Sequence, residues 1–193
     1  MSASGAVMIE HSQVVANAFP NAQRNQLFLH DARYTDISST AGDAMALNEV
    51  SLGAAFGDID NDGDTDIVVS NCNGPVELLR NHVGQSKPWL SIRLEGRASN
   101  MDGTGSRVAL ILRDQEPLWR RAHTDGSYLS ASDPRVLFSL GELGASEAII
   151  VGWFSGTREQ FAITELRTSV TLVEGTGSTM VHSGGSQNRR EPD

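Results

Sequence analysis

The sequence predicts a mainly β protein, and three observations support this. Apolar and polar residues alternate over 89–95 ("WLSIRLE"), which is the pattern of a half-buried strand. Further short runs are rich in β-branched residues and bounded by Gly, Pro, Asn or Asp. No stretch keeps a 3.6-residue period for three turns, although 39–49 suits a short helix. The other predicted strands are 66–70, 107–113, 135–140, 148–154 and 169–174.

Length and charge limit the classes of function. The chain has 193 residues, 39% of them hydrophobic, which is enough for one ordinary domain or two small ones. The formal net charge of −9 and the pI of about 4.9 argue against a general affinity for nucleic acid or anionic membranes. No run approaches the roughly 18 apolar residues of a membrane span, and the beginning of the chain lacks the features of a signal peptide. We therefore expect no membrane span and no export signal.

The residue types also restrict the metal chemistry. Cys72 is the only cysteine, so an intrachain disulfide and a thiolate-rich zinc site are excluded. The five histidines are scattered without His-x-x-x-His spacing, which gives little support to zinc or non-haem iron.

An acidic loop at 58–66 ("DIDNDGDTD") is the most informative motif. Five aspartates alternate in nine positions, and such a density of like charge predicts a bound cation. Hard divalent cations take oxygen ligands, and calcium accepts more of them, in more flexible geometry, than magnesium does. The flanks read as strands, and Val69 stands where an EF-hand would place its closing Glu. The loop therefore predicts a calcium site in a β-hairpin.

The spacing assigns a role to each aspartate. Three side chains at alternate positions are the expected ligands, Gly63 permits the sharp turn, and the backbone carbonyl of residue 64 adds another oxygen. The last aspartate closes the site with a bidentate carboxylate. The predicted metal residues are Asp58, Asp60, Asp62, Asp64 and Asp66.

Two segments resemble known families. The stretch 53–81 ("GAAFGDIDNDGDTDIVVSNCNGPVELLRN") resembles an FG-GAP or VCBS repeat, the calcium-binding blade unit of β-propellers, and 27–42 is similar to the strand pair before that loop. From residue 89 the pieces "WLSIRLEG", "GTGSRVAL", "DGSYLSASDPRVLFSLG" and "VGWFSGTREQF" resemble the ASPIC/UnbV domain at the C-terminus of cartilage acidic protein-like bacterial proteins. The resemblance implies a β-propeller-blade-like repeat packed against a small antiparallel β-sandwich-like domain.

The expected domains are 1–84 with the calcium loop, 85–177 as the ASPIC/UnbV domain, and a polar Gly/Ser-rich tail at 178–193. Relatives of this type carry several repeats, whereas this chain has one or one and a half. A single blade leaves open sheet edges, so we expect residues 1–84 to pack against the ASPIC/UnbV strands or another subunit.

Two functions are predicted from these features. The first is a calcium-binding, non-enzymatic β module for adhesion or self-assembly, as a homo-oligomer or with a protein partner. The second is a small UnbV-like enzyme of secondary metabolism in which calcium is structural. Its catalytic candidates are His123, Asp125 and Tyr128, in the polar run 120–133. A cavity lined by these residues favours the enzyme, and an exposed edge strand favours the module.

The sequence also bears on where the protein is located and on carbohydrate as a ligand. The family resemblance and the calcium loop indicate an extracellular or cell-surface protein, and the absence of a signal peptide makes the cytoplasm the alternative. Carbohydrate is a possible but unsupported ligand, through Trp89, Trp119 and Trp153.

Overall fold

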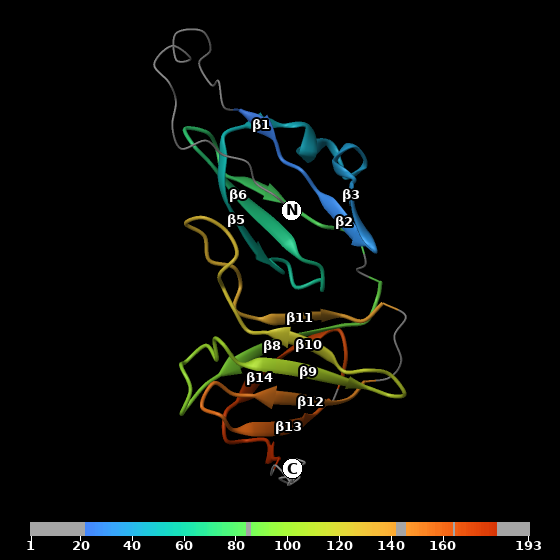
Figure 1. Ribbon diagram of the computed structural model, residues 1–193, viewed down its shortest axis with the longest axis vertical. Coiled ribbons are helices and arrows are strands. Elements are labelled where there is room, and N and C mark those ends of the chain that lie inside the picture. The colour runs from blue at the N-terminus through green and yellow to red at the C-terminus, as the bar shows by residue number, and fades with distance from the viewer. Residues whose placement is uncertain (1–21, 84–85, 142–145, 164, 181–193) are drawn as a thin grey trace, which may run out of the picture.

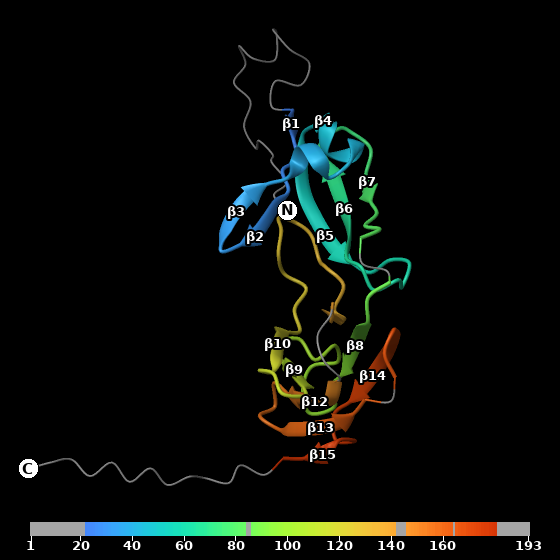
Figure 2. The same cartoon turned by 90° about the vertical axis from the view of Figure 1, so that its right-hand side faces the viewer.

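The computed structural model describes residues 22–83, 86–141, 146–163 and 165–180. These residues form strands and two short 3-10 helices, with no α-helix among them, so the predicted mainly β class is confirmed. Two lobes lie end to end in Figures 1 and 2, one holding β1–β7 and the other β8–β15. No helix in the described part of the chain is long and apolar enough to cross a membrane.

The second lobe contains two sheets. The larger sheet has the order β10-β9-β12-β13-β15, with all neighbours antiparallel. Its strands are β9 (Arg107–Leu112), β10 (Leu118–Arg121), β12 (Ser146–Gly152), β13 (Arg158–Ala162) and β15 (Ser178–Thr179). The smaller sheet has the order β11-β8-β14 and consists of β8 (Trp89–Glu95), β11 (Val136–Ser139) and β14 (Thr168–Val173). Here β14 runs parallel to β8, a departure from the antiparallel pairing that the sequence led us to expect.

One hydrophobic cluster joins these two sheets. On β8 the alternating residues Leu90, Ile92 and Leu94 are almost fully buried, as their period predicts. They pack in one cluster with residues of β9, β11, β12 and β14. The main core of the described chain therefore lies in the second lobe.

The first lobe is built from small sheets. Two antiparallel pairs of strands are β1 (Gln23–Arg24) with β4 (Asn48–Glu49), and the hairpin of β2 (Phe28–Asp31) with β3 (Arg33–Asp36). The helix predicted within 39–49 appears as two 3-10 turns, η1 (Ser38–Thr40) and η2 (Asp43–Ala46). The third sheet has the order β5-β6-β7, with β5 (Ser51–Gly57), β6 (Asp66–Asn71) and β7 (Glu77–Leu79). Among the described residues of the first lobe, few hydrophobic side chains are buried: Met45, Val50, Ala54 and Val69.

A long connection between β10 and β11 joins the lobes. It rises from the second lobe and runs along the free edge of β5 (Figures 1 and 2). The hydroxyls of Ser127 and Ser132 accept hydrogen bonds from the N–H groups of Ala54 and Phe56, and the N–H of Asp133 donates to the Phe56 carbonyl. The edge of β5 is thereby covered by this connection, and not by the strands of the second lobe that the sequence analysis expected.

The predicted tail begins with ordered structure. Residues 178–179 form β15 against β13, and the N–H of Met180 donates to the carbonyl of Arg158. The sheet therefore extends into the segment that composition assigned to a tail, and residues 181–193 lie outside the described part of the chain.

Candidate metal site and the cavity beside it

The acidic loop connects β5 to β6, as the β-hairpin prediction requires. The two strands pair antiparallel, with Gly57 opposite Asp66 at the end where the loop begins and ends. The alternation of the loop residues brings carboxylates from both ends of the loop to this point.

Three of the five predicted ligands converge. Carboxylate oxygens of Asp58, Asp60 and Asp66 lie within 4.8 Å of one another. The first and last of these residues are 4% and 0% exposed, whereas Asp60 lies at the surface. Closely spaced carboxylate oxygens are the donor set that hard divalent cations prefer. The residues present therefore fit a divalent cation.

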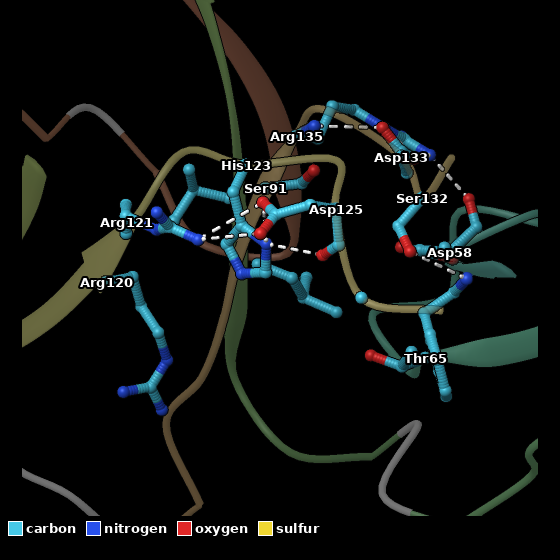
Figure 3. Close-up of a pocket in the computed structure, with 15 residues that line it drawn as sticks. Asp58, Thr65, Ser91, Arg120, Arg121, His123, Asp125, Ser132, Asp133 and Arg135 are labelled. Carbon is cyan, nitrogen blue, oxygen red and sulfur yellow. Dashed lines mark hydrogen bonds and ion pairs between the residues drawn. The ribbon is translucent and has the colours of Figure 1, made fainter. Parts of the chain in front are cut away.

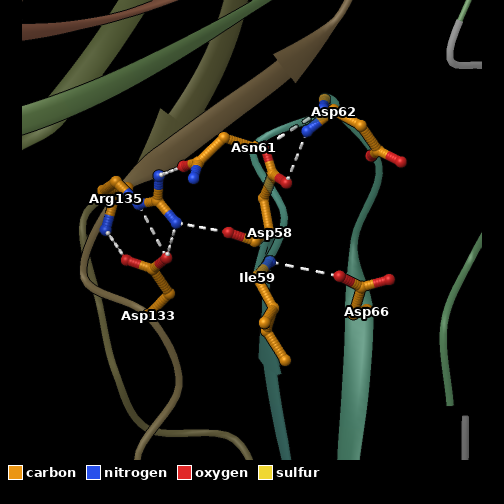
Figure 4. A network of polar contacts seen from close by, with 8 residues as sticks. Asp58, Ile59, Asn61, Asp62, Asp66, Asp133 and Arg135 are labelled. Carbon is orange, nitrogen blue, oxygen red and sulfur yellow. Dashed lines mark hydrogen bonds and ion pairs between the residues drawn. The ribbon is translucent and has the colours of Figure 1, made fainter. Parts of the chain in front are cut away.

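Backbone groups hold the two buried carboxylates in place (Figure 4). The Asp66 oxygens accept hydrogen bonds from the N–H groups of Ile59 at 3.1 Å and Asn81 at 2.8 Å. The Asp58 oxygens accept from the N–H groups of Asp62 and Gly63, both at 3.1 Å. These contacts fix the carboxylates before any cation binds, so binding requires little rearrangement of their side chains.

The other two aspartates lie outside this trio. Asp62 accepts a hydrogen bond at 3.0 Å from the N–H of Asp64, which supports the turn. The Asp64 side chain is 7% exposed, and its Oδ2 has no hydrogen-bond partner among the described residues. Burial and then the nearby charges of Asp62, Asp58 and Asp66 raise its pKa. The carbonyl ligand at residue 64 and the ligand role of Asp62 stay predictions.

Two arginines at the loop were missed by the sequence analysis. Arg80 forms an ion pair with Asp60, and only the pairing of β6 with β7 brings it there. Arg135 donates to the carbonyl of Asp58 at 2.5 Å, to Asn61 Oδ1 at 2.7 Å and to Asp133 Oδ2 at 2.7 Å (Figure 4). No local signal marks either residue as part of the site, because their partners in the acidic loop lie far away in the sequence.

The loop also packs directly on the second lobe. Gly63 lies against the ring of Trp89 on β8, and its carbonyl accepts a hydrogen bond from the Ser139 hydroxyl at 3.2 Å. Together with the contacts of Arg135, these interactions place the candidate metal site at the junction of the lobes.

A cavity of about 340 Å³ lies beside the loop (Figure 3). The polar run 120–133 forms much of its wall. His123 Nδ1 lies 2.9 Å from the carbonyl of Asp125, and Arg121 donates to both Asp125 carboxylate oxygens at 3.1 and 3.2 Å. A backbone hydrogen bond and then the Arg121 charge lower the pKa of Asp125. The side chains that line the cavity include those of Arg120, Arg121, His123, Asp125, Ser91 and Leu137.

The three catalytic candidates are only partly assembled. His123 and Asp125 both line the cavity, whereas Tyr128 is 59% exposed and lies outside its wall. Two of the three candidates are therefore brought together at the cavity, without Tyr128.

The three tryptophans do not share one surface. Trp89 and Trp153 are buried, and the Trp153 indole donates to Glu159 Oε2 at 2.7 Å. Only Trp119 is exposed, with Arg107 and Arg158 over its ring.

The comparisons with known proteins identify one domain. Residues 96–179 match the family described as "ASPIC and UnbV", so an ASPIC/UnbV domain occupies most of the second lobe. No FG-GAP or VCBS repeat is detected in the first lobe. A search of curated proteins finds no match to the chain.

Proposed function

We propose that this protein is a calcium-binding, non-enzymatic β module for adhesion or self-assembly, in which the cation stabilises the junction between the lobes. The observation that carries the proposal is the convergence of Asp58, Asp60 and Asp66 within 4.8 Å, at a loop packed on the second lobe. When bound, calcium supplies positive charge to these carboxylates and constrains the loop.

The charge balance of the loop supports a cation. Five carboxylates lie between residues 58 and 66, and Arg80 forms an ion pair with the one that lies at the surface, Asp60. Arg135 approaches the loop through the Asp58 carbonyl and Asn61. Three of the carboxylates belong to buried residues, and buried like charges without a counter-charge are costly. A divalent cation offsets that cost, so its binding should stabilise the folded state.

Exposed apolar strands support self-association. On the β2–β3 hairpin Phe28, Leu29 and Tyr34 are exposed, and on β7 Leu78 is half exposed. β7 is an edge strand of its sheet, and open edges favour pairing with another chain. A homo-oligomer formed through these strands is the form of assembly that we propose.

The proposal extends to the kind of fold in each lobe and to the location of the protein. We interpret residues 53–81 as a divergent FG-GAP-like, propeller-blade-like repeat and the second lobe as sandwich-like. The extracellular or cell-surface location belongs to the same proposal, because calcium at extracellular concentrations fills even weak oxygen-ligand sites.

The test compares Asp66→Asn with a matched control. Asp102→Asn removes the same charge from a partly exposed residue of the second lobe that pairs with Arg93, away from the acidic loop. Calorimetric titration with calcium after treatment with EGTA should show binding in wild type and in Asp102→Asn, and loss of binding in Asp66→Asn. Calcium should raise the melting temperature of the same two proteins, with sedimentation velocity reporting assembly in parallel.

Each outcome bears on a separate part of the proposal. Absence of calcium binding in wild type would overturn the metal site. Binding with no rise in melting temperature would overturn the stabilising role. A monomer at all concentrations, with and without calcium, would overturn self-assembly while leaving the metal site intact.

A small enzyme is the second candidate, and the cavity favours it. His123 and Asp125 both line the cavity, and His123 Nδ1 lies 3.2 Å from a carboxylate oxygen of Asp125, which is the contact that an acid–base pair requires. The exposed position of Tyr128 removes one proposed participant, and calcium would then have only the structural role described above.

A further inference from the structure

The charges that line the cavity leave one guanidinium without a carboxylate. Arg121 is paired with Asp125, and Arg135 with Asp133. The Asp58 carboxylate accepts hydrogen bonds within its own loop. Arg120, in contrast, pairs with no carboxylate among the described residues; it lies over the Phe138 ring at 5.8 Å and donates to the neighbouring Trp119 carbonyl. The cavity therefore presents a positive charge whose position is held by an aromatic ring.

A buried hydroxyl that lines the cavity also has no partner among the described residues. Ser91 is 1% exposed, it lines the cavity, and its Oγ makes no hydrogen bond to any described residue. It alternates along β8 with the core residues Leu90 and Ile92 and therefore lies on the opposite face of the strand. A buried hydroxyl without a partner costs free energy, which a bound polar group removes.

The remaining wall is apolar in part. Phe56, Val136 and Leu137 line the cavity beside the polar groups. Its volume of about 340 Å³ lies at the lower end of the roughly 300–1,000 Å³ usual for ligand pockets. Apolar walls with a few convergent polar groups are the usual composition of a small-molecule site, and such sites are often found between domains.

We infer that this cavity binds a small organic anion, a carboxylate or a phosphate monoester with an apolar body. Arg120 pairs with the anionic group, Ser91 donates its hydroxyl, and Phe56 and Leu137 contact the body. Arginine suits either group because its planar guanidinium can form two parallel hydrogen bonds. The inference does not depend on calcium, because it uses no carboxylate of the acidic loop.

The experiment uses benzoate and phenyl phosphate as probes and benzamide as the uncharged control. Binding to the full chain is followed by amide chemical shifts, with the loop first saturated with calcium and then treated with EGTA. We expect at least one of the two anions to shift the amide signals of Ser91, Arg121 and Gly126. Benzamide should bind at least about tenfold more weakly than that anion. Comparison of the two anions distinguishes a carboxylate site from a phosphate site.

Two variants test the assigned residues. Arg120→Gln should weaken binding of the preferred anion by about tenfold or more, and Ser91→Ala by a few-fold. Arg113→Gln is the matched control, because Arg113 is exposed, pairs with Glu147 and lies outside the cavity. Absence of shifts with either anion, with and without calcium, would overturn the inference. Equal affinity in Arg120→Gln and wild type would also overturn it.

Discussion

Gly63 is the residue at which the acidic loop touches the second lobe. Its φ of +92° lies in the left-handed region, which favours glycine. A Cβ at this position would lie 2.2 Å from ring atoms of Trp89, a distance that no side chain tolerates. The glycine of the motif thus serves both the turn and the contact with β8.

Gly63→Ala should therefore be strongly destabilising. We expect a loss of about 2–4 kcal/mol in the free energy of unfolding, from backbone strain together with the displaced indole. Gly156→Ala is the matched control, because Gly156 has a similar φ of +95° and a Cβ added there would meet no atom within 4 Å. It should cost about 1–2 kcal/mol. Urea unfolding measures both, and equal losses would show that the Trp89 contact is unimportant.

Glu174 is a buried carboxylate enclosed by donors. Its Oε2 accepts the N–H groups of Arg97, Ala98 and Ser99 at 2.8, 2.9 and 2.7 Å, and its Oε1 accepts the Ser155 hydroxyl at 2.5 Å. Burial acts to raise its pKa, but these hydrogen bonds outweigh burial and lower the pKa to about 2. The ionised side chain therefore holds the loop at 97–99 against the end of β14.

Stability should consequently fall in acid. The folded-state pKa of Glu174 lies below its ordinary value of 4.5, so the unfolded chain takes up the proton first. The contribution is complete above about pH 5 and is lost as the pH falls towards 2. Urea unfolding between pH 6 and pH 2 measures this dependence. In Glu174→Gln the pH dependence should be smaller than in wild type and in Glu116→Gln, which changes an exposed residue; an unchanged dependence would contradict the assignment.

At the scale of elements, the joint between the lobes depends on the close approach of two backbones. A Cβ on Gly53 of β5 would lie 2.3 Å from Ser130 Oγ and 2.5 Å from the Tyr128 carbonyl. Glycine at this position lets the connection between β10 and β11 reach the edge of β5 and form its hydrogen bonds with Ala54 and Phe56.

Gly53→Ala should loosen this joint. We expect the free energy of unfolding to fall by about 1–3 kcal/mol, because the connection must move away from β5. Hydrogen exchange at Ala54 and Phe56 should accelerate as their serine partners withdraw. Gly126→Ala provides the control on the connection itself, because a Cβ there meets nothing within 4 Å. Unchanged exchange in Gly53→Ala would show that the connection adapts without leaving β5.

At the scale of the whole molecule, stability is divided unequally between the lobes. The main hydrophobic cluster draws its residues from 90–172, whereas the first lobe buries few large side chains. Hydrophobic burial is the dominant favourable term in folding. The stability of the first lobe should therefore depend more on its contacts with the second lobe and on neutralisation of the negative charge of the acidic loop.

The first lobe should therefore become less stable than the second lobe when calcium is removed. With EGTA, exchange of the β5 and β6 amides should become faster than exchange of the β8, β9 and β12 amides, at denaturant concentrations that leave the second lobe folded. On the function proposed above, calcium should bring the two rates closer, because a cation that bound only the folded loop would stabilise the first lobe. Equal protection of both lobes with EGTA would show that the joint alone makes unfolding cooperative.

Local sequence patterns determined most of the strands, the acidic loop and the family of the second lobe. The six strands predicted from alternation and β-branched runs appear at β6, β8, β9, β11, β12 and β14, because the period of a half-buried strand is written in adjacent residues. The acidic loop was likewise visible, since its aspartates are neighbours in the chain. The ASPIC/UnbV domain was visible for the same reason, in short motifs that each lie within one segment.

Only the tertiary structure decided which residues surround the loop and the cavity. Arg135 reaches the Asp58 carbonyl across 77 positions of sequence, and Arg80 reaches Asp60 only through strand pairing. The tertiary structure also separates Asp62 from the converging carboxylates. It leaves Ser91 Oγ buried without a partner among the described residues, although Ser91 belongs to the polar face of its strand. Alternation predicts which face a residue occupies, but what covers that face depends on contacts between distant segments, which no local period encodes.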